Sequence, residues 1–154
     1  MNLRQIVAKD QREIIKIYFN SINSIEDNLY SKKQKLAWCS QAWKNSEFRK
    51  TIINGKGWIV EDDLKKLGFA IRYPLDRLSL FYCLGESRRK GYGSILLNQI
   101  EYEALSDNVD TLKTEASLIS YRLLLKRDWE ILSKETIIIN DTSFDRYKMI
   151  KRLK

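Results

Sequence analysis

The sequence contains no histidine and only two cysteines, Cys39 and Cys83, among its 154 residues. The absence of histidine excludes His-based triads, histidine general bases and most zinc or iron sites. Because two cysteines so far apart in the sequence do not form a metal-binding pair, we expect no metal site. In a cytoplasmic protein, such a pair is typical of reduced, buried thiols.

Long apolar runs are also lacking, since none approaches the ~18 residues that a membrane-spanning helix needs. The segment 1–10 has no apolar signal core and carries charges throughout, so we expect a cytoplasmic protein without membrane contact. The apolar content of 44% and the charged content of 31% are those of an ordinary globular protein. We therefore expect a single domain over residues 1–154.

The net charge of +8 is compatible with an anionic partner. The basic residues form three separate clusters, namely Lys32, Lys33 and Lys35, then Arg88, Arg89 and Lys90, then Lys148, Lys151, Arg152 and Lys154. A polyanionic cofactor could use the middle cluster, and the other two are interpreted as solvated faces. A nucleic-acid partner is ranked last because the aromatic residues fall on predicted buried faces and are not interleaved with the basic clusters.

Hydrophobic periodicity predicts the element order β, α, α, β, β, β, α, β, α, β, β. The expected segments are a strand at 3–7, a helix at 11–22, a helix from 31 that continues brokenly to 53, strands at 57–61, 66–72 and 78–84, a helix at 91–106, a strand at 111–116, a helix at 117–127, and strands at 129–139 and 144–150. Asp10 with Glu13, and Ser31 with Gln34, predict capping boxes at the starts of the first two helices.

The segment 86–101 lies between the apolar strand at 78–84 and the helix at 91–106. The first amides of a helix have no internal acceptor and carry the positive end of its dipole. Gly91 and Gly93 lack Cβ atoms, so an anion can approach the backbone closely. The three basic residues at 88–90 add positive charge at the same place. The pattern predicts a phosphate site, although a solvated helix start has the same pattern.

The segment Arg88-Arg89-Lys90-Gly91-Tyr92-Gly93 resembles the Gln/Arg-x-x-Gly-x-Gly/Ala signature of the GNAT superfamily of N-acetyltransferases. In that family the backbone amides of this loop hold the pyrophosphate of acetyl-CoA. The element order is also similar, and it implies an α/β (α+β) fold with a mixed, mostly antiparallel sheet of about six to seven strands and about four flanking helices. The fourth and fifth strands, here 78–84 and 109–116, would splay apart. A narrower likeness to a bacterial branch rests on Tyr30-Ser31-Lys32-Lys33-Gln34 followed by Ala37-Trp38.

The resemblance implies acetyl-CoA as co-substrate and assigns residues to it. The implied cofactor-binding residues are Tyr82, Cys83, Leu84, Arg88, Arg89, Lys90, Gly91, Tyr92, Gly93, Ser94, Ser117 and Ser120. Cys83 also raises the alternative of a covalent acyl-enzyme, but no histidine accompanies it, which favours a buried core cysteine.

The sequence departs from the family at the position of a tyrosine that serves many members as general acid, because Leu124 stands there. The glycine four residues later is replaced by Asp128. Tyr121, one turn earlier on the same helix face, is the candidate substitute acid, with a packing tyrosine as the alternative. Glu86 is the candidate general base and Asp76 a second local candidate, with turn or loop carboxylates as the alternative.

The acceptor side would be built from the region between the first two helices. The candidate substrate-binding residues there are Glu26, Asp27, Tyr30 and Trp38, with Trp43 also available. Two carboxylates can bind a cationic amine. The alternative for this region is a solvated loop with two core tryptophans.

The leading hypothesis is an N-acetyltransferase that moves an acetyl group from acetyl-CoA to a primary amine of a small molecule or protein, by direct attack in a ternary complex. The second is a non-catalytic acyl-CoA-binding or regulatory module, because Leu124 replaces the tyrosine. The third is a basic nucleic-acid-binding protein, suggested by the net charge. A homodimer is compatible with the resemblance, since dimers are frequent in this family.

Overall fold

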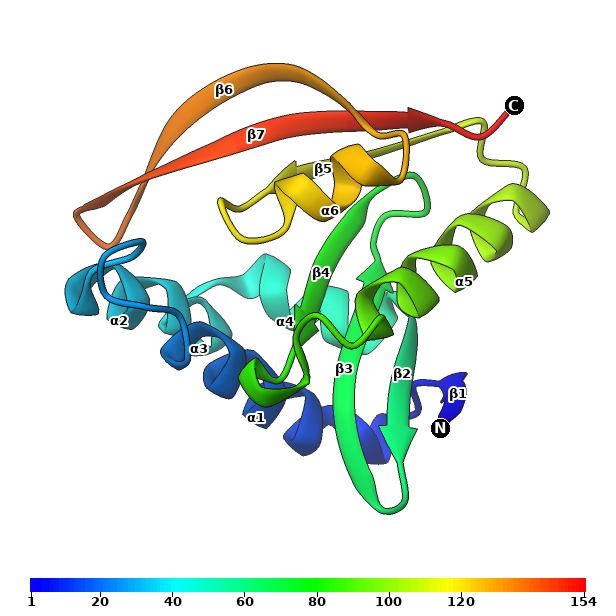
Figure 1. The fold of residues 1–154 in the computed structure, drawn as a ribbon, viewed down its shortest axis with the longest axis horizontal. Helices are drawn as coiled ribbons and strands as arrows, with labels where there is room; N and C mark the ends of the chain where they lie inside the picture. Colours follow the sequence, from blue (N-terminus) through cyan, green and yellow to red (C-terminus); the bar gives the residue numbers. More distant parts are fainter.

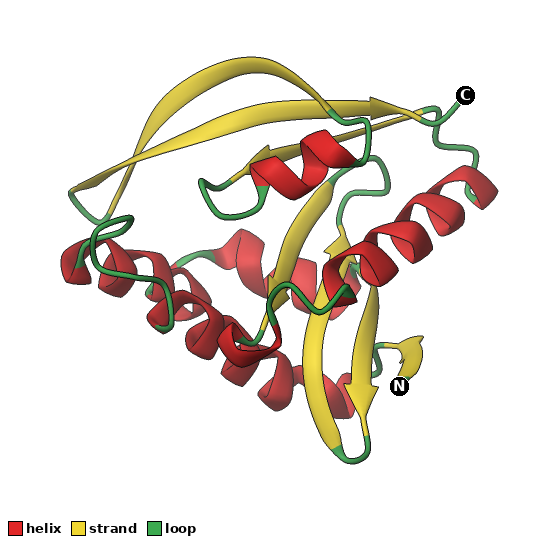
Figure 2. Ribbon diagram, in the orientation of Figure 1, coloured by secondary structure: helices red, strands yellow, loops and turns green.

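The computed structural model describes residues 1–154 and contains two antiparallel sheets (Figures 1 and 2). The first has the order β1-β2-β3-β4, formed by Asn2–Gln5, Lys56–Asp62, Lys65–Arg72 and Leu78–Cys83. The second has the order β5-β7-β6, formed by Thr111–Ala116, Thr142–Arg152 and Glu130–Ile139. The predicted single sheet is therefore divided in two, while the predicted total of strands is confirmed.

Helices cover both faces of the first sheet (Figure 1). The helices are α1 (Gln11–Asn23), α2 (Lys32–Cys39), α3 (Gln41–Lys44), α4 (Ser46–Asn54), α5 (Tyr92–Ser106) and α6 (Tyr121–Lys126), with 3-10 turns at Ala8–Asp10 and Gly85–Ser87. Strand alternation divides the core, because Phe69 and Ile71 of β3 pack with α1 while Ala70 packs with α5. No helix is both long and apolar enough to cross a lipid bilayer.

The strands β4 and β5 belong to different sheets but touch where β4 begins and at the middle of β5. The amide of Lys113 donates to the carbonyl of Asp76 (2.9 Å), and Thr114 Oγ1 donates to the carbonyl of Leu78 (2.6 Å). Beyond these contacts β4 pairs only with β3 and β5 only with β7. The predicted splaying of the fourth and fifth strands is thus confirmed.

The hairpin of β6 and β7 arches over α6, and its tip reaches the helices on the other side of the molecule (Figure 1). There Gln34 Nε2 of α2 donates to the carbonyl of Ser143 (3.0 Å), and Lys44 Nζ of α3 donates to Asn140 Oδ1 (3.3 Å). These bonds connect the tip of the β6–β7 hairpin to α2 and α3, which are far from it in the sequence.

Two local predictions about helix starts have different outcomes. Ser31 and Gln34 form the expected capping box, with Gln34 N donating to Ser31 Oγ (3.1 Å) and Ser31 N donating to Gln34 Oε1 (2.8 Å). The box predicted from Asp10 and Glu13 is wrong. The Asp10 carboxylate instead accepts from the amide of Val7 (2.8 Å) and from Arg4 (2.9 Å), because the chain makes a 3-10 turn before α1 begins.

Two predicted helical segments have different outcomes. The helix predicted from 31 is broken, as expected, into α2, α3 and α4, and Asn45 caps α4 by accepting from the amide of Glu47 (2.9 Å). The helix predicted at 117–127 begins only at Tyr121. Ser117 Oγ accepts from the amides of Ile119 (3.2 Å) and Ser120 (3.1 Å), so the residues before Tyr121 form a capped turn.

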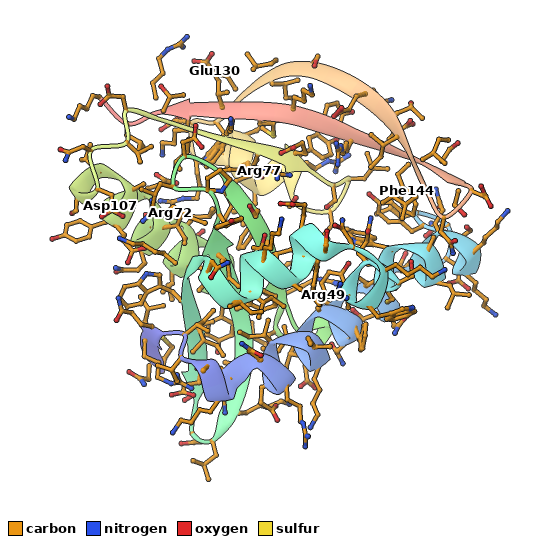
Figure 3. All side chains as sticks on the ribbon, turned by 180° about the vertical axis from the view of Figure 1, so that it is seen from behind. Arg49, Arg72, Arg77, Asp107, Glu130 and Phe144 are labelled. Atoms are coloured by element: carbon orange, nitrogen blue, oxygen red, sulfur yellow. The ribbon has the colours of Figure 1, made fainter.

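A buried charge network fixes the end of β3 to the end of α5 (Figure 3). The Arg72 side chain is fully buried, and its Nη2 lies 3.0 Å from Glu103 Oε1 and 2.5 Å from Asp107 Oδ2. Its Nη1 donates to the carbonyl of Leu75 (2.7 Å), and Lys56 adds a second ion pair to Asp107 (3.0 Å). Hydrogen bonds from the Arg72 guanidinium, and then from the Lys56 ammonium, lower the pKa of the Asp107 carboxyl.

We predict that Arg72→Ala lowers the free energy of unfolding by about 3 kcal/mol, because Glu103 would stay largely buried without its counter-ion and Asp107 would keep only Lys56. Urea unfolding followed by circular dichroism measures the change. The control is Arg152→Ala, whose pair with Glu130 is 3.7 Å long and mostly exposed, and which should cost less than about 1 kcal/mol. Equal losses for the two variants would contradict the prediction.

Helix α6 ends in a left-handed turn at Asp128, with φ of 68°. The amide of Trp129 donates to the carbonyl of Leu124 (3.0 Å), as in a Schellman motif, and the Trp129 ring is buried in the core. Asp128 therefore occupies the conformation that glycine adopts without strain.

We predict that Asp128→Gly raises the free energy of unfolding by about 1 kcal/mol, since the left-handed conformation strains any residue with a Cβ atom. Asp128→Ala removes the same charge but keeps the Cβ, so it should not stabilise the protein. Thermal and urea unfolding of the two variants provide the comparison. Stabilisation by alanine as large as that by glycine would show that the charge, and not the backbone, is responsible.

Candidate functional site

A cleft of about 220 Å³ opens beside the point where β4 and β5 part. Strand β4 and the end of β5 form one side, α2 to α4 form a second, and the β6–β7 hairpin forms a third. Figure 3 labels Arg77 and Phe144, which line it from the start of β4 and from β7. The cleft thus joins elements from nearly the whole chain at the splayed strands.

Splaying leaves backbone groups of both strands without a strand partner. The amide of Leu84 donates to the carbonyl of Leu67 (2.8 Å), so alternation along the ladder turns the N–H and C=O groups of Phe81 and Cys83 away from β3. The bond from Leu153 N to Asp110 O (2.7 Å) likewise turns the backbone of Glu115 away from β7. An extended ligand can pair with such groups as an added strand does.

The loop before α5 presents free amides at the end of β4. Gly91 caps the helix in the left-handed conformation, with φ of 86°, and the first intrahelical donor is Ile95 N, which bonds to Gly91 O at 3.2 Å. The amides of Tyr92, Gly93 and Ser94 therefore have no acceptor in the protein. No neighbouring side chain accepts a hydrogen bond from them either.

The two glycines of the loop have different reasons to be glycine. A Cβ at Gly91 would meet nothing within 4 Å, so its positive φ alone selects glycine there. A Cβ at Gly93 would lie 2.8 Å from Leu123 Cδ2 and 3.2 Å from Phe81 Cζ. Gly93 thus permits α5 to pack closely against α6 and β4, and Gly91 leaves open space above the amides.

Only two of the three basic side chains at 88–90 have no hydrogen-bond or ion-pair partner in the protein. The Arg88 guanidinium donates to the carbonyl of Ser21 at the end of α1, and burial lowers its pKa. Arg89 and Lys90 are exposed and have no ion-pair partner. The charge next to the free amides therefore comes from these two residues, while Arg88 ties the loop to α1.

The predicted cofactor residues on β4 lie at the splay. Tyr82 lines the cleft, where its hydroxyl accepts from Trp38 Nε1 (3.2 Å), and burial raises its pKa. Burial also raises the pKa of the Cys83 thiol to about 11, so the thiol is protonated near neutral pH. A protonated thiol is a poor nucleophile, which favours the interpretation of Cys83 as a core cysteine over that of a covalent acyl-enzyme.

The structure brings some predicted residues together at the cleft. Ser117 and Ser120 line it where β5 ends, with their hydroxyls 3.2 Å apart. Tyr30 and Trp38 line it from the side of α2, and Tyr30 Oη accepts from the amide of Leu118 (2.9 Å). Both predicted aromatic substrate residues therefore lie beside two of the predicted cofactor residues.

Other predicted residues lie elsewhere. Glu26 and Asp27 are exposed and do not line this cleft, and Asp27 is paired with Lys35 (2.8 Å), which lowers its pKa. Glu86 is exposed, outside the cleft, and bonded to Lys65, which lowers its pKa. Tyr121 stacks on Tyr147 at a centroid distance of 4.6 Å, and its hydroxyl accepts from Arg122 at the surface. The expected pair of acceptor carboxylates is thus not in this cleft.

The cleft contains functional groups that sequence reasoning missed. Arg77 and Glu115 form a bidentate pair across the start of the splay, with Nη2–Oε1 and Nε–Oε2 distances of 2.8 and 3.1 Å. Glu115 occupies an outward position of the predicted strand, which was a signal available in the sequence. Phe144 had no such signal, since it reaches the cleft only because the β6–β7 hairpin bends back to α2. The structure shows no cluster of three or more metal-ligating side chains.

No protein-family model matches the chain, and no curated protein sequence matches it. Solved structures do match it over nearly its whole length. A GCN5-related N-acetyltransferase from Rhodopseudomonas palustris is 22% identical, covers 98% of this chain and 94% of its own, and has a TM-score of 0.90. The PaiA N-acetyltransferase from Thermoplasma acidophilum, solved in complex with coenzyme A, is 14% identical, with 99% of both chains covered and a TM-score of 0.76.

A third similar structure is the YncA protein of Salmonella typhimurium, solved with its cofactor acetyl-CoA. It is 16% identical, covers 100% of this chain and 94% of its own, and has a TM-score of 0.70. At identities this low, the three structures establish a shared shape alone. The chain therefore has the fold of the GCN5-related N-acetyltransferases.

Proposed function

We propose that the chain is an N-acetyltransferase that moves an acetyl group from acetyl-CoA to a primary amine. The observation that carries the proposal is the set of free amides from Tyr92 to Ser94, which lies at the end of a strand that has parted from its parallel neighbour. A helix start of this kind binds anions, and the gap between the strands suits an extended arm. Two proteins of the same fold were solved with coenzyme A or acetyl-CoA bound, and this supports the binding of acetyl-CoA here.

In this proposal the pyrophosphate lies on the amides of Tyr92, Gly93 and Ser94, near the charges of Arg89 and Lys90. The pantetheine arm lies between β4 and β5, where it pairs with the free backbone groups of Phe81, Cys83 and Glu115. The thioester then lies farther along the gap, toward the point where β4 and β5 part, and the amine approaches from the cleft there. The side chains of Ser117 and Ser120 are at hand for the arm where β5 ends.

The reaction requires a neutral amine, because free alkylamines have a pKa near ~10.4 and an ammonium cannot attack a thioester. After loss of one proton to a carboxylate or water, the amine nitrogen bonds to the thioester carbonyl carbon. A backbone N–H of β4 near Cys83 can stabilise the oxyanion. The C–S bond then breaks, the amide forms, and the second amine proton ends on the departing CoA sulfur.

A second candidate function is that of an acyl-CoA-binding module without turnover. The observation that favours it is Leu124, which is 1% exposed within the core at the position where the resemblance leads one to expect a tyrosine acid. Tyr121 has its hydroxyl at the surface beside Arg122. This candidate shares the binding site with the first and differs only in whether free CoA is released.

We predict that acetyl-CoA and CoA bind to the protein in isothermal titration, and that Gly91→Ala weakens both by about tenfold or more. The added Cβ strains the left-handed residue and fills the space above the amides. Pantetheine, which lacks the pyrophosphate, should bind equally to both proteins. Absence of binding at millimolar acetyl-CoA would argue against the transferase and the binding module alike.

A matched pair of charge variants separates local from general electrostatics in the same titration. Replacement of Arg89 and Lys90 by alanine should weaken CoA binding and reduce its dependence on salt. Replacement of Lys32 and Lys33, an equally exposed pair at the start of α2, should change neither. Similar effects of the two double variants would mean that net charge, rather than the loop, binds CoA.

We predict release of CoA thiol from acetyl-CoA when primary amines are supplied, measured with a thiol reagent. Tyr121 remains the proposed general acid, and Tyr121→Phe should lower kcat by about a hundredfold if its proton reaches the sulfur. An unchanged kcat would mean that the thiolate leaves without this residue. Binding of acetyl-CoA without release across a panel of amines would favour the binding module.

A further inference from the structure

The inner part of the cleft is a wall of aromatic rings contributed by four separate segments. Tyr30 and Trp38 lie 5.1 Å apart between ring centroids, and Phe144 lies 6.2 and 6.3 Å from them. Tyr82 continues the wall at 6.2 Å from Trp38. All four line the cleft. These residues are called the aromatic wall below.

The polar atoms of the aromatic wall already have partners within the protein. Tyr30 Oη accepts from the amide of Leu118 (2.9 Å), and Trp38 Nε1 donates to Tyr82 Oη (3.2 Å). The carbonyl of Trp38 accepts from Tyr18 Oη (2.7 Å). The wall therefore offers a ligand apolar contact rather than hydrogen bonds. The rings of Tyr30 and Phe144 are themselves buried, so the accessible ring surface comes from Trp38 and Tyr82. Ile137 and Ile139 of β6 extend the apolar lining across the cleft.

Three carboxylates also line the cleft, and they differ in burial. The side chain of Glu115 is 22% exposed, against 46% for Asp145 and 66% for Glu47. Glu115 lies where β4 and β5 part, on the strand that flanks the gap. Arg77 occupies two of the roughly four lone-pair positions of its carboxylate, so the others can accept hydrogen bonds from an amine.

The remaining charges in the cleft disfavour a second positive charge on the ligand. Two guanidiniums line it, those of Arg77 and Arg146, and the two outer carboxylates each have a lysine partner already. Glu47 pairs with Lys50 at 3.3 Å and Asp145 with Lys134 at 3.8 Å. The second ammonium of a polyamine would therefore meet two guanidiniums, and the only other acids near it are exposed carboxylates that already share their charge with a lysine.

We infer that the acceptor is a small aromatic primary amine with one positive charge, whose nitrogen is held by Glu115 and whose ring packs on the aromatic wall. The inference rests on the proposed acetyl transfer and names its substrate class. A cleft of about 220 Å³ is smaller than the roughly 300–1,000 Å³ of sites for drug-sized ligands, so it suits one ring system rather than a long chain. Glu115 would hold the ammonium, take its proton before the attack on the thioester, and pass that proton to water.

The first test compares three amines as acceptors of acetyl-CoA, namely 2-phenylethylamine, ethylamine and spermidine. Because burial of an aromatic side chain is worth about one to two powers of ten in affinity, kcat/KM for 2-phenylethylamine should exceed the other two values by about tenfold to a hundredfold. Equal or higher kcat/KM for spermidine or ethylamine would overturn the inference and leave the acetyl transfer in place.

Neighbouring residues of β6 provide a matched pair of variants. Ile137 lines the cleft, whereas Ile138 points to the opposite face and is 67% exposed. Ile137→Ser should raise KM for 2-phenylethylamine by about tenfold and leave KM for ethylamine unchanged, while Ile138→Ser should alter neither. An Ile137→Ser enzyme with both KM values unchanged would contradict the placement of the ring.

Glu115→Gln tests the placement of the nitrogen. It should lower kcat/KM by about tenfold or more for every amine, move the acid limb of the kcat/KM profile, and leave the Kd of acetyl-CoA unchanged. A purely structural role would not move the pH profile. An unaltered profile with unaltered kcat/KM would remove Glu115 from the site.

If no amine is acetylated, the proposed function fails but the inference about the ligand can still be decided. Titration calorimetry of the wild-type protein with 2-phenylethylamine and with spermidine then gives the answer without turnover. Tighter binding of 2-phenylethylamine by about tenfold, lost in Ile137→Ser, supports the aromatic site. Equal or weaker binding than spermidine overturns it.

Discussion

The structure depends on the separation of two parallel strands after a single point of contact. Two hydrogen bonds, from Lys113 N and Thr114 Oγ1, hold the middle of β5 to the start of β4, and neither strand pairs with the other beyond them. Unpaired backbone groups in a protein interior are costly, so the gap persists only because both strands are fixed from outside. Strand β4 is held by its pairing with β3, and β5 is held by its pairing with β7. Helix α6 and the β6–β7 hairpin lie on the β5 side of the gap.

Strand β4 supplies three different surfaces to this gap, because side chains and backbone groups alternate along it. Leu80 and Tyr82 face the core packed by α1, while Phe81 and Cys83 face the core packed by α5. The free backbone groups of Phe81 and Cys83 point into the gap itself. One short strand therefore adjoins the free amides of α5 at its end, the aromatic wall on one face and Gly93 on the other, which explains why these features lie so close together.

Much of this arrangement could be predicted from local patterns. The loop before α5, the splayed strands and the Ser31 cap depend on neighbours within a few residues or on the order of elements, both of which periodicity reveals. The partner of Arg88, the carbonyl of Ser21, depends on how α1 packs, and the pairing of Arg77 with Glu115 depends on where two strands part. The capping box predicted from Asp10 is wrong because an acid at this position can accept hydrogen bonds either from the helix amides or from the turn before the helix. Here the Asp10 carboxylate accepts from Val7 N and Arg4, so it caps the turn.

The two sides of the gap are built from elements that are largely independent. The free amides and their glycines belong to the β4–α5 connection. Gly93 cannot carry a larger side chain without displacing Leu123 and Phe81, which lie against it. The aromatic wall instead depends on α2 and the β6–β7 hairpin, which meet through the bond from Gln34 to Ser143 and through the packing of Trp38 on Phe144. Substitutions in the hairpin can therefore reshape the cleft without moving the loop. A fold arranged in this way can keep the loop and the gap between the strands while the lining of the cleft changes, so the shared shape constrains the loop more firmly than it constrains the cleft.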